Sequence, residues 1–371
     1  MKTLLLGDVS PTVHNAHLFA EQNVSALFGD ATSVFEHRDF VFVNLECALT
    51  EAEKEIPKFG PPLKAPKETA NTLKTLGVDC CGLSNNHVFD YGIDGMLDTL
   101  RALQGAGLGY TGFGKDYEDS RKNYTVEKNG ERIAIVAVCE HEYSYALENR
   151  MGSRPYDEYD TMEDIRNAKK DHDRVIVIYH GGTEYSPYPS PRLHKLCHAM
   201  ARNGADVVLC QHSHCIGCYE QYENCHILYG QGNFHFVRPD RKRASWHTSL
   251  AVEYDTAEHK ISFVPLRAGN AGIGLAVGED AEQIMKEFCE RSQKLQNGEW
   301  KDGWHAFCHG EAKDLYLTAI GRACLEDSTS MEHDRFGHFL DCEAHTDVWR
   351  ELFPSYNLTN ETDEREIEWN F

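Results

Sequence analysis

Five apolar runs in this chain each end in polar residues that can bind a metal ion or take part in catalysis. The runs are rich in Val, Ile and Leu, as strands buried on both faces are. In chain order they end in Gly7-Asp8-Val9-Ser10, Asn44-Leu45-Glu46, Ser84-Asn85-Asn86-His87, His180-Gly181-Gly182 and Gln211-His212-Ser213-His214. Parallel strands bring such ends together at one edge of a sheet, where open α/β sheets bind ligands. The sequence therefore predicts an α/β fold with a site at that edge.

The rest of the pattern supports this fold class. Short β-branched runs predict strands over 2–6, 40–44, 78–83, 132–138, 174–179, 206–210, 227–229, 249–254 and 260–265. Longer amphipathic segments predict helices over 16–35, 66–76, 93–106, 161–171 and 191–203. Asp94 and Gly107 are expected to bracket the third helix. The late strands lie close together in sequence, which favours hairpins.

The domain organisation follows from a change in character near residue 270. The length of 371 residues allows two or three domains, or one large α/β unit with a tail. Beyond 270 an exposed helix is expected over 279–296, followed by a stretch rich in Trp and His and an acidic tail from about 360. We therefore expect a main domain over 1–269 and a mainly helical appendage over 270–371 that packs on it.

The charge, the apolar runs and the cysteine content indicate which partners and which cellular compartment to expect. The formal net charge of −22 disfavours nucleic acid and anionic membranes as partners. No apolar run approaches the ~20 residues of a membrane span, and residues 3–6 are too short for the core of a signal peptide, so we expect no membrane insertion. The 13 cysteines indicate a reducing cytoplasm. An anionic substrate remains possible if metals or local cations offset the negative field. The oligomeric state is left open.

The residue types at the strand ends point to a particular class of metal. Carboxylate, amide and imidazole ligands together suit Mn, Zn or Fe, and one or two divalent ions would fit the set. A rival site of thiolates around Cys215-x-x-Cys218 has only one such pair, which disfavours it. Histidines outside the strand ends, including His194 and His198, are expected to be ordinary surface or core residues.

Six motifs in order resemble one known family. Gly7-Asp8, Asn44-Leu45-Glu46, Asn85-Asn86-His87 with Asp90-Tyr91-Gly92, His180-Gly181 with Glu184-Tyr185, His212-x-His214 and Tyr229-x-x-Gly232-Asn233-Phe234 resemble the bacterial capsule-synthesis family associated with poly-γ-glutamate (CapA-type, PGA_cap). The resemblance spans about residues 1–266. That family is similar to calcineurin-like metallophosphoesterases, so the resemblance implies a four-layer αββα sandwich with a metal centre at the strand ends.

The resemblance also implies roles for single residues. By position, Asp8 and His214 would bind a first metal, and Glu46 would bridge two metals. Asn86, His180 and His212 would bind the second metal.

This sequence also departs from the phosphoesterase pattern. Ser10 stands where that pattern has a ligating His, Glu46 replaces the usual Asp, and Gln211 replaces a Gly. The first two departures are shared with the capsule family.

The same resemblance makes His87 the acid that protonates the leaving group, with Asp90 orienting its imidazole. Two cations about 3.5–4 Å apart would polarise a substrate oxygen and activate a water molecule between them. Lys64, Glu184, Tyr185 and Asn233 are candidates for substrate binding. Alternatively, Glu184 and Tyr185 belong to an ordinary surface loop, and Asn233 only holds a loop.

Three functions fit these residues. The first is a CapA-like, metal-dependent hydrolase related to poly-γ-glutamate biosynthesis, acting on an anionic small molecule or polymer with γ-glutamyl or phosphoryl groups. The second is a metallophosphoesterase acting on phosphomonoesters, nucleotides or phosphodiesters. The third is a non-catalytic assembly factor in polymer synthesis. The ligand set together with His87 favours an enzyme.

Overall fold

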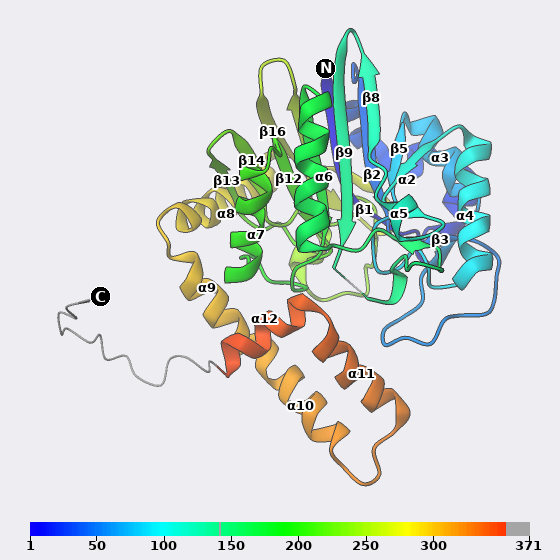
Figure 1. The fold of residues 1–371 in the computed structure, drawn as a ribbon. Helices are drawn as coiled ribbons and strands as arrows, with labels where there is room; N and C mark the ends of the chain where they lie inside the picture. Colours follow the sequence, from blue (N-terminus) through cyan, green and yellow to red (C-terminus); the bar gives the residue numbers. More distant parts are fainter. Residues whose placement is uncertain (141, 354–371) are drawn as a thin grey trace, which may run out of the picture.

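The computed structural model describes residues 1–140 and 142–353. The acidic tail expected from about 360 lies outside the described residues. Two β-sheets lie face to face at the centre, helices cover their outer faces, and the C-terminal helices extend from one end (Figure 1).

The first sheet has seven strands in the order β17-β16-β15-β1-β2-β5-β6. Strands β1, β2, β5 and β6 are parallel, while β15, β16 and β17 join antiparallel at the other side. The bounds are β1 Lys2–Val9, β2 Phe40–Leu45, β5 Cys80–Gly82, β6 Gly109–Thr111, β15 Thr248–Asp255, β16 Lys260–Ala268 and β17 Ile273–Leu275. Antiparallel pairing of β15 with β16 confirms the expected late hairpin.

The second sheet has six strands in the order β13-β14-β12-β11-β9-β8. Its central strands β14, β12, β11 and β9 are parallel, and the two edge strands are antiparallel to their neighbours. The bounds are β8 Tyr124–Lys128, β9 Glu131–Cys139, β11 Arg174–His180, β12 Val207–Gln211, β13 Tyr219–Tyr222 and β14 Cys225–Leu228. Two small sheets pair β3 Ala48–Leu49 with β4 Lys64–Ala65 and β7 Phe113–Gly114 with β10 Gly152–Ser153.

Three apolar cores lie between the four layers, and this layering confirms the expected αββα sandwich. One core lies between the sheets and holds alternate residues of facing strands, such as Leu5 of β1 and Ile176 of β11. A second joins the first sheet to α3 Thr69–Leu76 and α4 Gly92–Ala106, and a third joins the second sheet to α6 Glu158–Asp171 and α7 Pro191–Arg202. After the charged residues that begin β9 and β11, strands β9, β11 and β12 carry almost no polar residue before their last positions, because both faces are buried there.

The helix expected over 16–35 is wrong as a single helix. The chain forms α1 Ala16–Ala20, α2 Val24–Phe28 and a 3₁₀ helix over Gly29–Phe35. Gln22 has a φ of 55° and Gly29 a φ of 45°, and both left-handed residues interrupt the helical path. The helices expected over 66–76, 93–106 and 161–171 form with shifted starts, while the helix expected over 191–203 begins at Pro191 as predicted. Gly107 ends α4 in the left-handed conformation as expected, but Asp94 lies within the first turn of α4 and does not precede the helix. The short α5 spans Tyr117–Ser120.

The C-terminal helices are α8 Gly278–Gln296, α9 Trp300–Phe307, α10 Lys313–Ala323, α11 Ser330–Asp341 and α12 Glu343–Leu352. Helix α8 packs Ile284 and Phe288 into the core between the sheets. Helices α9 to α12 form a small core of their own around Trp304 and Tyr316. Strand β17 lies beyond residue 270 yet belongs to the first sheet. The boundary at 270 therefore stays a prediction.

None of the helices in the described part of the chain has the length and apolar character that crossing a membrane requires.

Candidate metal centre

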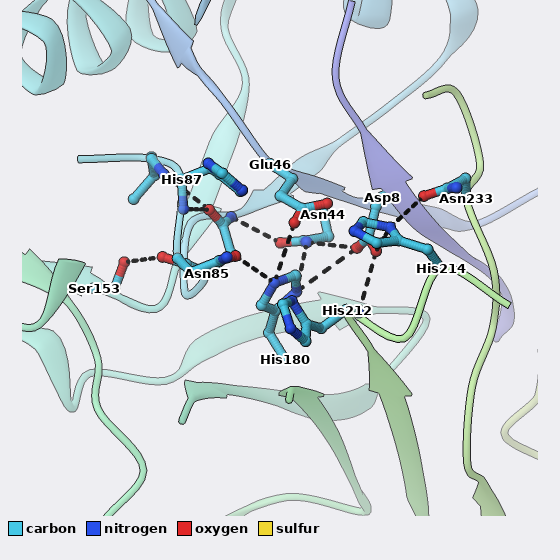
Figure 2. Close-up of polar contacts among 12 residues, drawn as sticks. Asp8, Asn44, Glu46, Asn85, His87, Ser153, His180, His212, His214 and Asn233 are labelled. Carbon is cyan, nitrogen blue, oxygen red and sulfur yellow. Dashed lines mark hydrogen bonds and ion pairs between the residues drawn. The ribbon is translucent and has the colours of Figure 1, made fainter. Parts of the chain in front are cut away.

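The strand-end residues of both sheets meet in one place (Figure 2). Asp8 ends β1 and Glu46 follows β2 in the first sheet, while His180 ends β11 and His212 follows β12 in the second. The sequence predicted a site at one sheet edge. The structure instead joins the carboxyl ends of two sheets, because the sheets are stacked with these ends on the same side.

Glu46 lies at the middle of this group without a hydrogen bond. Its side chain is 0% exposed, and neither carboxylate oxygen accepts a hydrogen bond from the described residues. The His180 ring approaches it, with Nε2 at 3.4 Å from Oε1. Burial raises the pKa of the Glu46 carboxyl above its usual value. A buried carboxylate normally has a charged or hydrogen-bonding partner, so this arrangement is costly for the protein alone.

Asp8 and His180 are linked through Asn44. The Asn44 amide nitrogen donates to Asp8 Oδ1 at 2.7 Å and lies 3.1 Å from His180 Nδ1. His180 Nε2 lies 3.0 Å from Asn86 Oδ1 and 3.4 Å from Glu46 Oε1. Burial, with the nearby Glu46 charge, raises the pKa of Asp8 to about 6, and burial lowers the pKa of His180 to about 4. Both pKa shifts arise mainly because burial removes water from the side chain and so disfavours its charged form.

His212 and His214 reach the centre from a strained backbone. Their φ angles are 78° and 52°, in the left-handed region that residues other than glycine rarely adopt. The His212 amide donates to Asp8 Oδ2 at 3.2 Å, and His214 Nδ1 donates to Asn233 Oδ1 at 2.8 Å. Burial opposes charging of His214, but the negative charges of Glu46, Glu184 and Asp8 raise its pKa overall. Backbone strain of this kind persists where the surrounding structure fixes it, and strained residues cluster at functional sites.

The loop after β5 presents two asparagines with different environments. Asn85 donates to Asn44 Oδ1 and to the Leu45 carbonyl, and it accepts from the His87 amide at 3.1 Å. It therefore holds the loop in place. Asn86 is the one whose side-chain oxygen faces His180.

His87 is part of a charged triad with Asp90 and Lys58. His87 Nδ1 donates to Asp90 Oδ2 at 2.7 Å, and Lys58 Nζ donates to Asp90 Oδ1 at 2.5 Å and to the Asn86 carbonyl at 3.0 Å. Burial would raise the pKa of Asp90, but His87 and Lys58 lower it below its usual value. Burial and the Lys58 ammonium lower the pKa of His87. The Asp90 carboxylate is thus held against the His87 imidazole, while the orienting role that the resemblance implies for Asp90 stays a prediction.

The donor set fits a divalent cation. One ligand atom each from Asp8, Glu46 and His180 lie within 4.8 Å of one another, and so do those from Glu46, His212 and His214. The two groups share Glu46, whose unpaired oxygens a cation would satisfy. This grouping differs from the resemblance, which put Asp8 with His214 and His180 with His212. The partition of ligands between two ions therefore stays a prediction.

The candidate substrate-binding residues lie at different distances from this centre. Asn233 contacts His214 directly, and the Tyr185 ring centre lies 6.4 Å from that of His214. Glu184 is close enough to influence the pKa of Glu46 and His214. Lys64 is in β4. Its ammonium donates to the Ala52 carbonyl and lies over the Tyr91 ring.

Close backbone contact fixes the loop of Asn233 against β1. A Cβ atom on Gly7 would lie 2.3 Å from the Gly232 carbonyl oxygen. Only glycine therefore fits at position 7 without displacing that loop. Ser10, the residue in place of a ligating His, is buried and its hydroxyl contacts the Cys47 thiol.

Sequence reasoning missed Asn44 and Lys58 as functional residues. Asn44 lies inside one of the six motifs, but nothing in the sequence showed that its amide joins Asp8 to His180. Lys58 lies in the loop before Gly60, and no local signal distinguishes it from exposed lysines nearby. Its side chain is 4% exposed, a value that only the fold reveals.

These features define a class: an α/β sandwich protein with a buried cluster of carboxylates and imidazoles at the joined ends of two sheets. Residues 2–238 match the family model of the bacterial capsule synthesis protein PGA_cap. The chain belongs to this family.

Named relatives agree with this assignment. The capsule biosynthesis protein CapA of Bacillus anthracis is 30% identical over 274 residues, covering 71% of this chain and 66% of the relative. The PGA biosynthesis protein CapA of Bacillus subtilis (strain 168) is 30% identical over 258 residues, covering 67% of this chain and 66% of the relative. A probable polyglutamine synthesis accessory protein of Mycobacterium tuberculosis is 29% identical over 242 residues, covering 61% and 63%. The matches thus span just under two thirds of these relatives.

Solved structures show a weaker likeness. A hypothetical protein from Thermus thermophilus matches with a TM-score of 0.45 and 15% identity, covering 72% of this chain and 100% of that one. A putative 5'-nucleotidase from Staphylococcus aureus in complex with alpha-ketoglutarate matches with a TM-score of 0.42 and 12% identity, covering 78% and 58%.

Proposed function

We propose that this chain is a metal-dependent hydrolase that acts on an anionic γ-glutamyl substrate in capsule or poly-γ-glutamate biosynthesis. The observation that carries the proposal is the Glu46 carboxylate, which is buried without a hydrogen bond among three imidazoles and the Asp8 carboxylate. A site that is only structural would satisfy such a group with protein donors. A cation is the partner that this geometry favours.

In this proposal the six strand-end residues hold one or two divalent ions of Mn, Zn or Fe. The residues are Asp8, Glu46, Asn86, His180, His212 and His214. When bound there, a cation supplies Lewis acidity toward a substrate oxygen and lowers the pKa of water. The strained backbone at His212 and His214 keeps both imidazoles aimed at the centre.

His87 then has a role that is separate from metal binding. Its Nδ1 donates to Asp90, which leaves Nε2 as the ring nitrogen available to a substrate. Once protonated, Nε2 can give its proton to the departing amine, and the Asp90 carboxylate stabilises the charged ring during that step. Lys58 fixes Asp90 from the other side and keeps the pair aligned. In this proposal Glu184, Tyr185 and Asn233, which surround His214, bind the substrate.

The test uses the purified full chain. Its metal content is measured, and turnover of a γ-glutamyl peptide is compared with turnover of a panel of aryl phosphates. We expect cleavage of the peptide that a chelator abolishes and an added divalent ion restores. Cleavage of aryl phosphates alone would instead support the metallophosphoesterase, and bound metal with no turnover of either substrate would support the assembly factor. Both outcomes contradict the proposal.

A further inference from the structure

A second group of metal-binding side chains lies on the outer face of the second sheet. Residues four apart on a helix project from the same side, so His194 and His198 of α7 lie next to each other. Glu220 of β13 lies opposite them. His198 Nε2 is 2.7 Å from Glu220 Oε1, and His194 Nε2 is 3.5 Å from the same oxygen. One ligand atom from each residue lies within 4.8 Å of the others.

We propose that His194, His198 and Glu220 form a second binding site, for a divalent transition metal of the zinc class. Two imidazoles and one carboxylate form a known zinc ligand set, in which water fills the fourth position. Two histidines four apart on a helix provide half of that set in metalloproteases, where a glutamate after the first histidine is the general base. Here that position holds Lys195. The site therefore lacks that general base, and it shares no residue with the candidate metal centre.

Both imidazoles are held in place by aromatic rings. The His194 ring is stacked on Trp300 with centroids 4.8 Å apart and an interplanar angle of 24°. The His198 ring is stacked on Tyr222 with centroids 3.6 Å apart and an angle of 15°. The rings would therefore lose little freedom on binding an ion, and this preorganisation favours affinity.

The surroundings also suit a cation. The three side chains are 14–23% exposed, so an ion can enter from solvent and keep a water ligand. The Glu220 carboxylate, which also accepts from the Tyr229 hydroxyl at 2.7 Å, offsets the charge of the ion.

An ion bound here would connect three parts of the fold. It would tie α7 to β13 through the protein ligands, and it would fix the His194 ring against Trp300. Trp300 is the first residue of α9, where the C-terminal helices leave the sandwich. The site is therefore placed to stabilise the attachment of those helices.

The test measures zinc alone, by equilibrium dialysis of the chelator-treated full chain. The wild type is compared with His198→Ala and with a matched control, His305→Ala. His305 is also four residues from a histidine, His309, and near a glutamate, Glu351, but its side chain is 60% exposed. We expect His198→Ala to lose one equivalent of zinc and His305→Ala to keep it. Loss in the control instead of in His198→Ala overturns the proposal.

A local signal identifies the position of the ion. Cu²⁺, which prefers the same nitrogen and oxygen ligands, quenches tryptophan fluorescence at short range. We expect Cu²⁺ to quench Trp300, so that the quenched amplitude falls in Trp300→Phe and in His198→Ala. Trp246, which lies near the candidate metal centre, contributes the same fluorescence signal in the wild type, Trp300→Phe and His198→Ala. Equal quenching of the wild type and His198→Ala overturns the proposal.

A second variant covers the case in which His198→Ala does not fold. Glu220→Gln keeps the size of the side chain and can still contact Tyr229 and His198, but it lacks the negative charge. We expect its zinc affinity at this site to fall by at least about 10-fold. Unchanged affinity in a folded Glu220→Gln protein also contradicts the proposal.

Discussion

At the scale of single residues, two buried glutamates show how differently the fold treats the same side chain. Glu140 follows β9 and accepts from the Tyr179 hydroxyl, from the Gly182 amide and from Arg192 at 2.8 Å. Glu46 is equally buried and accepts no hydrogen bond from the described residues. The protein itself satisfies the Glu140 carboxylate, while the Glu46 carboxylate needs a partner that is not part of the described chain.

This contrast predicts opposite effects of the same substitution. With metal removed by a chelator at pH 8, Glu46→Gln should raise the free energy of unfolding by about 1–2 kcal/mol, because it removes an uncompensated buried charge. Glu140→Gln should lower it by about 2–4 kcal/mol, because Arg192 loses one of its two carboxylate partners and keeps only Asp347. Urea unfolding measures both. Equal destabilisation by the two variants would show that Glu46 is satisfied within the chain.

His87 separates catalysis from metal binding. His87→Ala should leave the metal content near that of the wild type and lower turnover of a γ-glutamyl peptide by about 10²–10⁴, the usual contribution of a general acid. His212→Ala should lose metal and activity together, because it removes a ligand. Metal analysis and steady-state kinetics check both variants.

The leaving group provides the control for this prediction. A substrate whose leaving group needs no proton should reduce the loss seen in His87→Ala, and Asp90→Asn should lie between the wild type and His87→Ala. If His87→Ala strips the metal, the residue is a ligand and the proposed role is wrong.

At the scale of elements, the sequence predicted the strands more accurately than the breaks between helices. Strands such as β9 and β11 contain long apolar runs that are visible in the sequence, and so is the His180 that ends β11. The interruption at the exposed Gln22 was missed because glutamine itself carries no turn signal, although the next residue, Asn23, caps α2 by accepting from the Ala26 amide. Lys58 was missed for another reason: its partners Asp90 and His87 are about 30 residues away in the chain.

The junction of α12 with the second sheet contains a glutamate whose ionisation opposes folding. Burial and the neighbouring Glu140 charge raise the pKa of Glu343 from 4.5 to about 7. A carboxyl with a raised folded-state pKa favours folding at low pH, and this contribution is lost as the pH rises through about 7. Glu343→Gln should therefore stabilise the protein at pH 8 by about 1 kcal/mol, with the difference vanishing below about pH 4.5.

Glu332 is the control for this prediction. It completes the capping box of α11, and the Thr329 amide and Arg322 lower its pKa to about 2. Its contribution to stability is present above pH 4.5 and is lost as the pH falls toward 2. Glu332→Gln should therefore destabilise the protein at pH 8, where Glu343→Gln stabilises it. Thermal unfolding across this pH range compares them, and the same sign for both variants at pH 8 would contradict the assigned causes.

At the scale of the whole molecule, the net charge of −22 acts against an anionic substrate. Cations at the site, such as Lys58 or a bound metal, can offset this field locally. A polymer that extends beyond the site also experiences the field of the whole molecule's net negative charge. Repulsion of this kind acts over the Debye length, about 30 Å at 10 mM salt and about 8 Å at 150 mM.

Salt should therefore improve the binding of a long substrate. Raising the ionic strength from about 10 to 150 mM should lower the KM of a γ-glutamyl oligomer several-fold, because the screened field no longer repels the carboxylates outside the site. The KM of a short γ-glutamyl peptide should change less, since it has no carboxylates outside the site to screen. Steady-state kinetics at both salt concentrations compare the two substrates. If the KM of the oligomer rises with salt, the polymer is instead held by attraction to basic residues on the surface, and the site is built for a polyanion despite the net charge.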